Sequence, residues 1–367
     1  MAPTLDGIDW HLFLARPRIP SPPPETLHSL AQQSILLTGA GGSIAASLAL
    51  RLANLPARQL TLLEASESHL FSLQRDLRRT APAARAEFLL GSVADRALLE
   101  DVFASHAPRL IFHAAAFKHV PLLEEQPLAA IANNIFGTQQ LVSAATEFGA
   151  RVVLVSTDKA VEPTSVMGAT KRVAEQIVLA AGGTVQRLAN VLASRDSVVE
   201  VFASQLAEGG PLTVTDPAAR RFFVTVEEAV NLLLAAALQP PEPALFVPSL
   251  PQPQFVAGLA RFLAQELAPG KNIELAFTRL RPGDKESEQL WSTAEQAQAT
   301  SRPGLLSLAP ARMSTSALHP QLAQLHDALS ARDVAAAVAT LCRMVPGYTP
   351  SELVQSLVGK AGARVMP

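Results

Sequence analysis

The chain has 367 residues, of which 49% are hydrophobic and 17% charged, and its formal net charge is −2. This length suits one large α/β domain with an appended lobe, or two ordinary domains, and the apolar content argues against general disorder. The small net charge gives no reason to expect a nucleic acid or an anionic membrane surface as partner. Cys342 is the single cysteine, so an intramolecular disulfide is excluded and we predict no metal site.

The N-terminus lacks a basic region followed by an apolar core and a cleavage site, so we expect no signal peptide. The longest apolar runs, such as Leu232–Leu238, are much shorter than the ~20 residues that span a bilayer. We attribute the mean hydropathy of +0.22 to alanine in helices. These features predict a cytoplasmic protein without a membrane span.

Residues 1–33 are predicted to be an extended Pro-rich segment, because the stretch Arg16–Pro24 suits neither a helix nor a central strand. From Ser34 onward, short apolar runs alternate with segments of helical periodicity. Strands are predicted at Ser34–Thr38, Gln59–Glu64, Glu87–Leu90, Arg109–His113, Arg151–Ser156 and Thr184–Leu188. Helices are predicted at Ile44–Asn54, Glu67–Arg79, Arg96–His106, Pro127–Phe148 and Ser165–Ala180. This alternation predicts a doubly wound parallel sheet, a nucleotide-binding Rossmann domain over residues 34–190.

Beyond residue 190 the alternation is less regular, which indicates a smaller C-terminal lobe over residues 191–300 that closes over a ligand on the sheet. The chain is expected to return to the main domain near residues 220–250. Helices are predicted at Val198–Glu208, Val226–Ala237 and Pro253–Leu267, and strands at Ala244–Pro248 and Ile273–Phe277. The tail, residues 301–367, is predicted to be helical, because apolar positions recur across Leu318–Met344.

A glycine-rich turn follows the first predicted strand. Gly39, Gly41 and Gly42 allow a tight turn into the next helix and let a pyrophosphate approach the backbone, with the amides of Ser43 and Ile44 facing the anion. Ala45 occupies the position where this fingerprint has a third small residue. A glycine-rich turn with no ligand is the alternative interpretation.

Glu64 ends the second predicted strand. A carboxylate there can accept hydrogen bonds from both ribose hydroxyls of adenosine and would repel a 2′-phosphate. It therefore favours NAD as the cofactor, with NADP as the alternative. A solvated charge at the end of a strand is the other interpretation.

The segment Ser156–Arg172 reads STDKAVEPTSVMGATKR and follows the fifth predicted strand. It places Thr157, Asp158 and Lys159 at the carboxyl edge of the sheet, where ligands of open parallel sheets bind, and Lys171 in the next helix. A hydroxyl, a carboxylate and two ammonium groups beside a nicotinamide would serve redox-assisted proton chemistry. A surface turn with an ion pair is the alternative.

These segments resemble the polysaccharide-biosynthesis branch of the extended short-chain dehydrogenases, the nucleotide-sugar 4,6-dehydratases that act on UDP-N-acetylglucosamine. The similarity runs from about Leu14 to Leu353. Further matching segments are Phe112–Thr138, Ala189–Val199, Ala207–Val214, Arg220–Val226, Arg279–Leu290 and Met344–Ser351. Larger relatives carry an N-terminal membrane region, so the chain resembles a soluble version of them.

The resemblance implies catalytic roles for five residues. Met167 occupies the position of the usual tyrosine base, and its thioether has no titratable proton. Lys159, in its neutral form, is then expected to remove the 5-proton of a 4-keto sugar, and protonated Asp158 to assist loss of the 6-hydroxyl. Thr157 would hydrogen-bond the 4-oxygen. Lys171 would hold the nicotinamide ribose and lower nearby pKa values.

The resemblance also implies binding residues and partners. Expected further cofactor contacts are Ser92, Val93, Ala114, Ala115 and Ala116. Expected contacts to a UDP-sugar substrate are Lys118, His119, Asn190, Ser194, Arg195, Arg221, Arg281 and Asp284, with the arginines serving phosphate oxygens. A homo-oligomer is expected, since helices Pro127–Phe148 and Ser165–Ala180 form the usual pairing surface of this superfamily.

The chain departs from the family where glycine is usual, at Ala45, Ala189, Ala193 and Asp196, and Asp284 replaces a glutamate. These added side chains reduce the room near the expected substrate pocket. Two alternative functions stay open. A nucleotide-sugar 4- or 5-epimerase shares the first hydride step, and a non-catalytic Rossmann scaffold in glycan assembly would explain the lost glycines.

Overall fold

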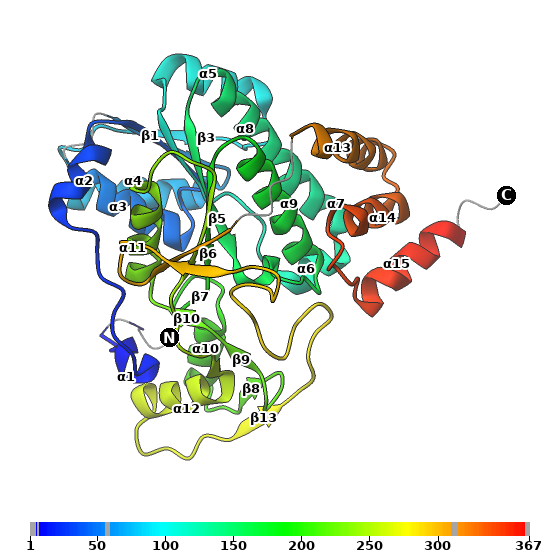
Figure 1. The fold of residues 1–367 in the computed structure, drawn as a ribbon. Helices are drawn as coiled ribbons and strands as arrows, with labels where there is room; N and C mark the ends of the chain where they lie inside the picture. Colours follow the sequence, from blue (N-terminus) through cyan, green and yellow to red (C-terminus); the bar gives the residue numbers. More distant parts are fainter. Residues whose placement is uncertain (1–4, 6, 56–58, 310–314, 364–367) are drawn as a thin grey trace.

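The computed structural model describes residues 5, 7–55, 59–309 and 315–363, so the ends of the predicted N-terminal segment and tail lie outside the described residues. Its centre is a nine-stranded sheet with the order β14-β15-β11-β6-β5-β4-β1-β2-β3 (Figure 1). The strands from β3 to β11 in this order run parallel. They are β1 (Ser34–Thr38), β2 (Gln59–Glu64), β3 (Ala86–Leu90), β4 (Leu110–His113), β5 (Arg151–Thr157), β6 (Thr184–Leu188) and β11 (Ala244–Pro248). The predicted doubly wound sheet is confirmed.

Helices cover both faces of the sheet. One layer contains α2 (Pro24–Ala31), α3 (Ser43–Ala53), α4 (Glu67–Thr80) and α11 (Val226–Ala237), and the other contains α5 (Arg96–His106), α8 (Gly137–Glu147) and α9 (Val166–Ala180). The leucine-, valine- and alanine-rich inner faces of these helices pack on strands that are buried on both sides, which accounts for the continuous apolar runs in the strand sequences. Within the described residues, no helix is both long and apolar enough to cross a bilayer.

The predicted helix 127–148 contains an unpredicted change of pitch. It begins as α7 (Pro127–Ala130), continues as a π-helical turn (Ile131–Phe136) and ends as α8. A π-helical turn inserts one residue into the helical repeat, so the side chains before and after it face directions that a regular helix would not give them.

A smaller lobe adjoins the carboxyl ends of the parallel strands (Figure 1). It contains α10 (Val198–Ala207), α12 (Val256–Leu267) and the short strands β7 (Asn190–Val191), β8 (Leu212–Val214), β9 (Arg220–Arg221), β10 (Phe223–Val224), β12 (Gln254–Phe255) and β13 (Leu275–Phe277). Its own apolar core lies between α10, α12 and β8. Because only Ala189 lies between the end of β6 and the start of β7, the lobe starts directly at the carboxyl edge of the sheet.

The N-terminal segment is less extended than predicted. Asp9 caps a short helix, α1 (Trp10–Leu14), whose aromatic residues pack on Phe262 of the small lobe. The proline-rich stretch itself lacks regular structure until Pro24, which is the first residue of α2. Proline is tolerated there because the first helical residue needs no N–H donor, so the stretch ends in a helix rather than preventing one.

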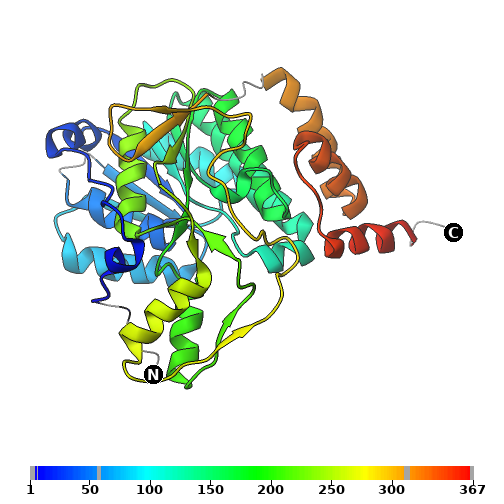
Figure 2. The same cartoon turned by 60° about the horizontal axis from the view of Figure 1, so that its bottom comes forward.

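The predicted helical tail is wrong at its start. Leu305–Leu308 forms β15, which pairs antiparallel with β11, and Ala297–Ala299 forms β14 beside it. Helices α13 (Thr315–Ser330), α14 (Val334–Met344) and α15 (Glu352–Ala363) follow, together with the earlier α6 (Val120–Glu125), at one side of the molecule (Figure 2). Apolar residues of α13 and α14 join the core formed by α9, so these helices cover part of the surface expected for pairing.

Candidate active site

The glycine loop is closed by a backbone contact that only glycine permits. Gly39 has a positive φ of 65°, and a β-carbon there would lie 2.7 Å from the Cα atom of Ala115, in the segment that follows β4. Gly42 caps α3 without a side-chain hydrogen bond, so no side chain of the cap occupies the amides of the first turn. Such free amides at a helix N-terminus suit phosphate oxygens. The loops after β1 and β4 thus form a surface that fits a dinucleotide.

Glu64 is directed at this loop and is buried, which rules out the solvated strand-end charge as an interpretation. Its Oε2 atom accepts a hydrogen bond from the Gly41 amide at 2.8 Å, and Oε1 accepts one from the Ser66 amide at 2.8 Å. Ser92 and Val93 follow β3, and Val93 packs against Gly137 at the start of α8. These residues lie where the sequence placed them, along the strand ends that border the loop.

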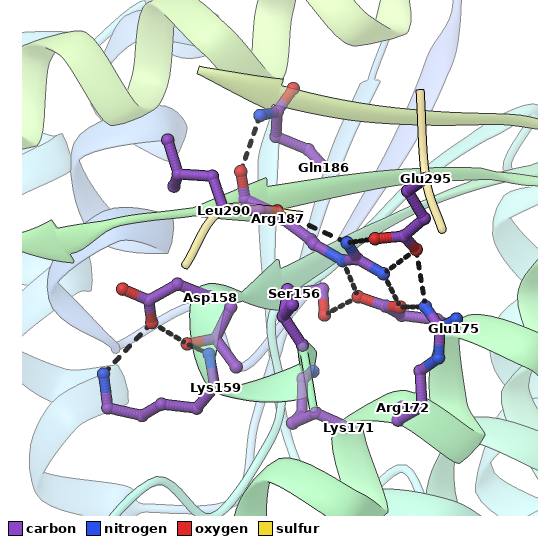
Figure 3. Close-up of polar contacts among 12 residues, drawn as sticks. Ser156, Asp158, Lys159, Lys171, Arg172, Glu175, Gln186, Arg187, Leu290 and Glu295 are labelled. Carbon is purple, nitrogen blue, oxygen red and sulfur yellow. Dashed lines mark hydrogen bonds and ion pairs between the residues drawn. The ribbon is translucent and has the colours of Figure 1, made fainter. Parts of the chain in front are cut away.

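Four polar side chains meet at the carboxyl end of β5. Lys159 Nζ lies 3.0 Å from Asp158 Oδ1 and 3.2 Å from Asn190 Oδ1. Asn190 Nδ2 donates to Asp158 Oδ2 at 3.2 Å, and Thr157 Oγ1 donates to Asp158 Oδ1 at 3.0 Å. Figure 3 shows Asp158 and Lys159 at the left of the view. Asp158 is fully buried, so these four side chains form an interior polar cluster and not a surface turn with an ion pair.

Glu288, which the sequence analysis did not single out, adds a second carboxylate to this group. Its Oε1 atom lies 3.5 Å from Lys159 Nζ, and the residue is 3% exposed. Burial on its own would lower the pKa of Lys159, but Asp158 and Glu288 outweigh burial and raise it. This raised pKa applies to the substrate-free protein, so the neutral form in which Lys159 is expected to act on a bound sugar stays a prediction. Burial raises the pKa of Asp158, in line with its expected role as an acid.

Lys171 and Met167 lie one turn apart on α9, and both are buried. Lys171 Nζ donates to the Val155 carbonyl at 2.8 Å, and burial lowers the pKa of Lys171 to about 8. Met167 packs in the apolar core between the sheet and the helices. The structure thus places no ionisable group where the tyrosine base of related enzymes is expected.

Asn134, in the π-helical turn, is a second residue that the sequence analysis missed. Its side chain accepts from the Phe117 amide at 2.8 Å and donates to the Phe117 carbonyl at 3.0 Å and to Thr170 Oγ1 at 3.1 Å. It therefore fixes the loop after β4 to α9. An asparagine pair, Asn133–Asn134, inside an otherwise apolar helix was the available signal.

A third missed feature is a buried ion network behind Ser156. Arg187 on β6 is fully buried and contacts Glu175 of α9 at 2.9 and 3.0 Å and Glu295 at 2.9 Å (Figure 3). Ser156 Oγ donates to Glu175 Oε1 at 2.7 Å. The network therefore connects β5, which leads to Asp158, to the helix that carries Lys171.

The expected substrate contacts do not converge on one point. Arg195 donates to the Gly41 carbonyl at 2.7 Å, so it lies at the cofactor loop rather than at a separate phosphate site. Its own carbonyl accepts from Lys118 Nζ at 2.5 Å, and its amide donates to Ser43 Oγ at 2.8 Å. These contacts fasten the small lobe over the glycine loop.

His119, which precedes α6, and Ser194, in the turn after β7, contact nearby residues. His119 Nε2 lies 3.7 Å from an Asp196 carboxylate oxygen. The Ser194 amide donates to the Val191 carbonyl at 3.4 Å, within the turn after β7.

The remaining arginines are engaged within the small lobe. Arg281 pairs with Asp284 at 2.8 Å, so these two expected substrate contacts bind each other. Arg221 donates to the carbonyls of Lys285 and Glu286 at 2.8 and 3.0 Å. Arg281 is largely exposed and Arg221 is partly exposed.

Comparison with known proteins identifies the family. The model of the family described as Polysaccharide biosynthesis protein matches residues 35–310. The chain belongs to this family.

Individual members resemble it over much of its length. The capsular polysaccharide biosynthesis protein CapD of Staphylococcus aureus is 36% identical over an alignment of 279 residues that covers 72% of this chain and 46% of CapD. The probable polysaccharide biosynthesis protein EpsC of Bacillus subtilis is 35% identical over 74% of this chain and 47% of EpsC. The chain thus spans about half the length of these relatives. UDP-glucose 4-epimerase of Rickettsia canadensis is 35% identical over 62% of this chain and 68% of the epimerase.

Solved structures confirm the fold. Pen from Bacillus thuringiensis superposes with a TM-score of 0.72 and 27% identity over 78% of this chain and 90% of Pen. The dTDP-glucose 4,6-dehydratase DesIV of Streptomyces venezuelae, solved with NAD and TYD bound, gives a TM-score of 0.60 at 21% identity over 70% of this chain and 87% of DesIV. The fold is that of the extended short-chain dehydrogenases, as the sequence predicted.

Proposed function

We propose that this chain is an NAD-dependent nucleotide-sugar 4,6-dehydratase and that its substrate is UDP-N-acetylglucosamine. The observation that carries the proposal is the contact between Asp158 and Lys159 at the ligand-binding edge of the sheet, combined with Met167 in the position of the tyrosine base. A site without that tyrosine has to move protons through other groups, and these two residues are placed to do so.

NAD is the proposed cofactor, with NADP as the alternative. The glycine loop, the uncapped amides of α3 and the buried Glu64 fit the diphosphate and adenosine ribose of a dinucleotide. When bound, NAD supplies a reversible acceptor for hydride, taken from the 4-position of the sugar and returned to the 6-position. Lys171 is proposed to hold the nicotinamide ribose.

Proton transfer from Lys159 to Asp158 would produce the neutral amine and the protonated carboxyl group that dehydration needs. The two groups are 3.0 Å apart, and moving one proton converts the ion pair into a neutral amine and a protonated carboxyl. A sugar that excludes water from the site favours this neutral pair, since unsolvated charges are costly. The amine then takes the 5-proton, and the carboxyl donates its proton to the departing 6-hydroxyl.

The remaining transfers restore the site. Lys159 returns a proton to the 5-position when the 6-position is reduced. The proton of the 4-hydroxyl is released to solvent during oxidation, and Lys159 takes one proton from solvent after the product leaves, so the ion pair is restored and the proton count of the protein is unchanged over the cycle. Thr157, which donates to Asp158, is proposed to hydrogen-bond the 4-oxygen, and Asn190, which contacts both Asp158 and Lys159, is proposed to orient the pair.

The test is incubation of the purified chain with UDP-N-acetylglucosamine and NAD, followed by mass spectrometry and NMR of the sugar. A product lighter by one water supports the dehydratase. Lys159→Ala is expected to abolish water loss, while Lys271→Ala, at an exposed lysine, is expected to turn over normally. Normal turnover by Lys159→Ala would contradict the assigned base.

A nucleotide-sugar epimerase is the second candidate, which the likeness to proteins named UDP-glucose 4-epimerase favours. An epimerase needs no acid at the 6-position, so Asp158→Asn would retain turnover, and the product would have unchanged mass with inverted stereochemistry. An unchanged sugar would support a non-catalytic scaffold.

We also propose a symmetric homo-oligomer. Because α13 and α14 cover part of the expected pairing surface, the assembly would have to use other surfaces as well. Light scattering of the purified chain measures its mass directly, and the mass of one chain would contradict assembly.

A further inference from the structure

The ammonium group of Lys159 has three polar oxygen neighbours. They are Asp158 Oδ1 at 3.0 Å, Asn190 Oδ1 at 3.2 Å and Glu288 Oε1 at 3.5 Å. An ammonium group has three N–H donors, so these neighbours match its donors one for one. Two of the three are carboxylates, and both belong to buried residues.

Glu288 has no role in the proton transfers proposed above, although burying its carboxylate costs free energy. Its side chain is 2% exposed, and its Oε2 atom is buried without a hydrogen-bond partner. Lys285 Nζ lies 3.5 Å from that atom. Burying a carboxylate costs free energy unless nearby opposite charges compensate it. Lys159 and Lys285 supply that compensation for Glu288.

The segment that carries Glu288 is fastened to the catalytic loop. Lys285 Nζ donates to the carbonyl of Val161, two residues after Lys159, at 2.5 Å. Arg221 of β9 donates to the Lys285 carbonyl at 2.8 Å. The carboxylate of Glu288 is thus held beside Lys159 by contacts to both the small lobe and the catalytic loop.

We propose that Glu288 is a positioning residue for Lys159, whose carboxylate holds the ammonium group beside Asp158 and keeps it charged until a sugar excludes water from the site. The role rests on the proposed function, in which Lys159 becomes the base only in the presence of substrate. Without Glu288, the lysine would lose a proton more readily and would lose one of its three anchors.

The charges that face Lys159 set the direction of the expected effect. Burial and the positive charge of Arg221 lower the pKa of Lys159, whereas Asp158 and Glu288 raise it. Removing the charge of Glu288 leaves Asp158 as the single carboxylate opposing burial. The pKa of Lys159 is therefore expected to fall.

The experiment measures acetylation of individual lysines at pH 9 by mass spectrometry, on the full chain without substrate. Only the neutral amine reacts, so the rate reports the deprotonated fraction. In Glu288→Gln, the rate at Lys159 is expected to rise by about tenfold or more, because one nearby opposite charge shifts a pKa by at least about one unit. Glu286→Gln, an exposed glutamate of the same segment, is the matched control and should leave the rate unchanged.

Lys171 serves as an internal control, since it is buried against Val155. An equal rise at Lys159 and Lys171 would mean that the site has opened generally, and would overturn the proposal, as would an unchanged rate at Lys159. Glu288→Asp retains the charge and should return the rate toward the wild-type value. If Glu288→Gln does not fold, the double variant Glu288→Gln/Lys285→Gln removes both partners of the second pair and serves the same test.

Turnover assays separate this inference from the proposed function. A faster reaction at Lys159 with no sugar product would support the role of Glu288 and reject the dehydratase. In an active enzyme, the acidic limb of the kcat/KM profile should move to lower pH in Glu288→Gln and stay in place in Glu286→Gln. If the enzyme is active and the acidic limb of the pH profile of kcat/KM is the same in Glu288→Gln and the wild type, the role of Glu288 is rejected.

Discussion

Gly168, in the first turn of α9, faces the carbonyl oxygen of Lys159 so closely that a β-carbon in its place would overlap that oxygen. The same β-carbon would lie 3.0 Å from Cβ of Pro163. Because the main obstacle is backbone, it cannot move aside as the end of a flexible side chain can. The absence of a side chain at Gly168 is therefore what lets the turn that carries Asp158 and Lys159 pack on the helix that carries Lys171.

Gly168→Ala is expected to lower the free energy of unfolding by about 1–3 kcal/mol, since inserted atoms in a packed core force backbone shifts. It should also lower kcat, because the displaced turn carries Lys159. Urea unfolding and turnover measure the two effects. Gly258→Ala is the control, since its β-carbon would meet only Cβ of Phe255 at 3.8 Å and alanine favours the helix by about 0.5–1 kcal/mol. Similar losses in both variants would contradict the assignment.

The four positions where the family usually has glycine divide into two kinds. Ala193 and Asp196 both have a φ of 55°, in the left-handed region, whereas Ala45 and Ala189 do not have a positive φ. Ala193→Gly is therefore expected to raise the free energy of unfolding by about 1 kcal/mol, because an L-residue in this region costs roughly 1–2 kcal/mol. The gain at Asp196→Gly should be smaller, because aspartate tolerates the left-handed region better.

Ala45→Gly is the opposite control. Ala45 is buried inside α3, so glycine there should lower the free energy of unfolding by about 1 kcal/mol. Urea unfolding of the three variants provides the comparison. A loss of stability in Ala193→Gly would show that the methyl group makes contacts worth more than the strain.

The fold could be read from the sequence because the parallel strands and their helices have strong local patterns. The strand β15 could not, because Leu305–Leu308 is short and is stabilised by pairing with β11, which is distant along the chain. Likewise, the π-helical turn that orients Asn134 leaves no signature in hydrophobic periodicity.

In the candidate site, too, contacts within one segment were predictable from the sequence and contacts between distant segments were not. The residues of STDKA form the end of one strand and the turn after it, so their proximity was predictable. Glu288 and Asn190 reach Lys159 from other parts of the chain, so their contacts required the structure. The raised pKa of Lys159 has the same origin, since one of the two carboxylates that cause it comes from a distant part of the chain.

His113 makes the stability of the chain depend on pH below neutrality. It is fully buried between Thr38 Oγ1 at 2.8 Å and Thr138 Oγ1 at 2.9 Å, and burial lowers its pKa from 6.5 to about 3. Below pH 6.5 the unfolded chain binds a proton that the folded chain does not bind. Stability is therefore expected to fall as the pH is lowered from 6.5 to about 3, by up to about 1.4 kcal/mol per pH unit from this residue.

His113→Gln retains hydrogen-bonding groups but cannot titrate, so the slope of unfolding free energy against pH should be smaller in this window. Urea unfolding at a series of pH values measures the slopes, and only the slope, not the absolute stability of the variant, bears on the prediction. Equal slopes in the variant and the wild type would show that His113 does not remain neutral in the folded chain.

Glu295 should produce a second pH effect at lower pH. Arg187 binds it through two hydrogen bonds of 2.9 Å, and although burial opposes this, the contacts to Arg187 lower the pKa of Glu295 from 4.5 to about 2. A depressed carboxylate pKa contributes stability that is fully present above pH 4.5 and is lost as the pH falls toward 2. Glu295→Gln is therefore expected to be less stable than the wild type by about 2–4 kcal/mol at pH 7, and the difference should shrink between pH 4.5 and 2.

Glu100→Gln supplies the comparison for this prediction, because Glu100 pairs with Arg96 at 2.6 Å but is half exposed. Exposed ion pairs contribute little to stability because water screens them, so this variant should stay close to the wild type at every pH. Because Arg187 also binds Glu175, which bonds Ser156, Glu295→Gln should in addition weaken the support of the strand that precedes Asp158. A Glu295→Gln variant with wild-type stability at pH 7 would show that Glu175 alone compensates the buried arginine, and that the second carboxylate does not stabilise the site.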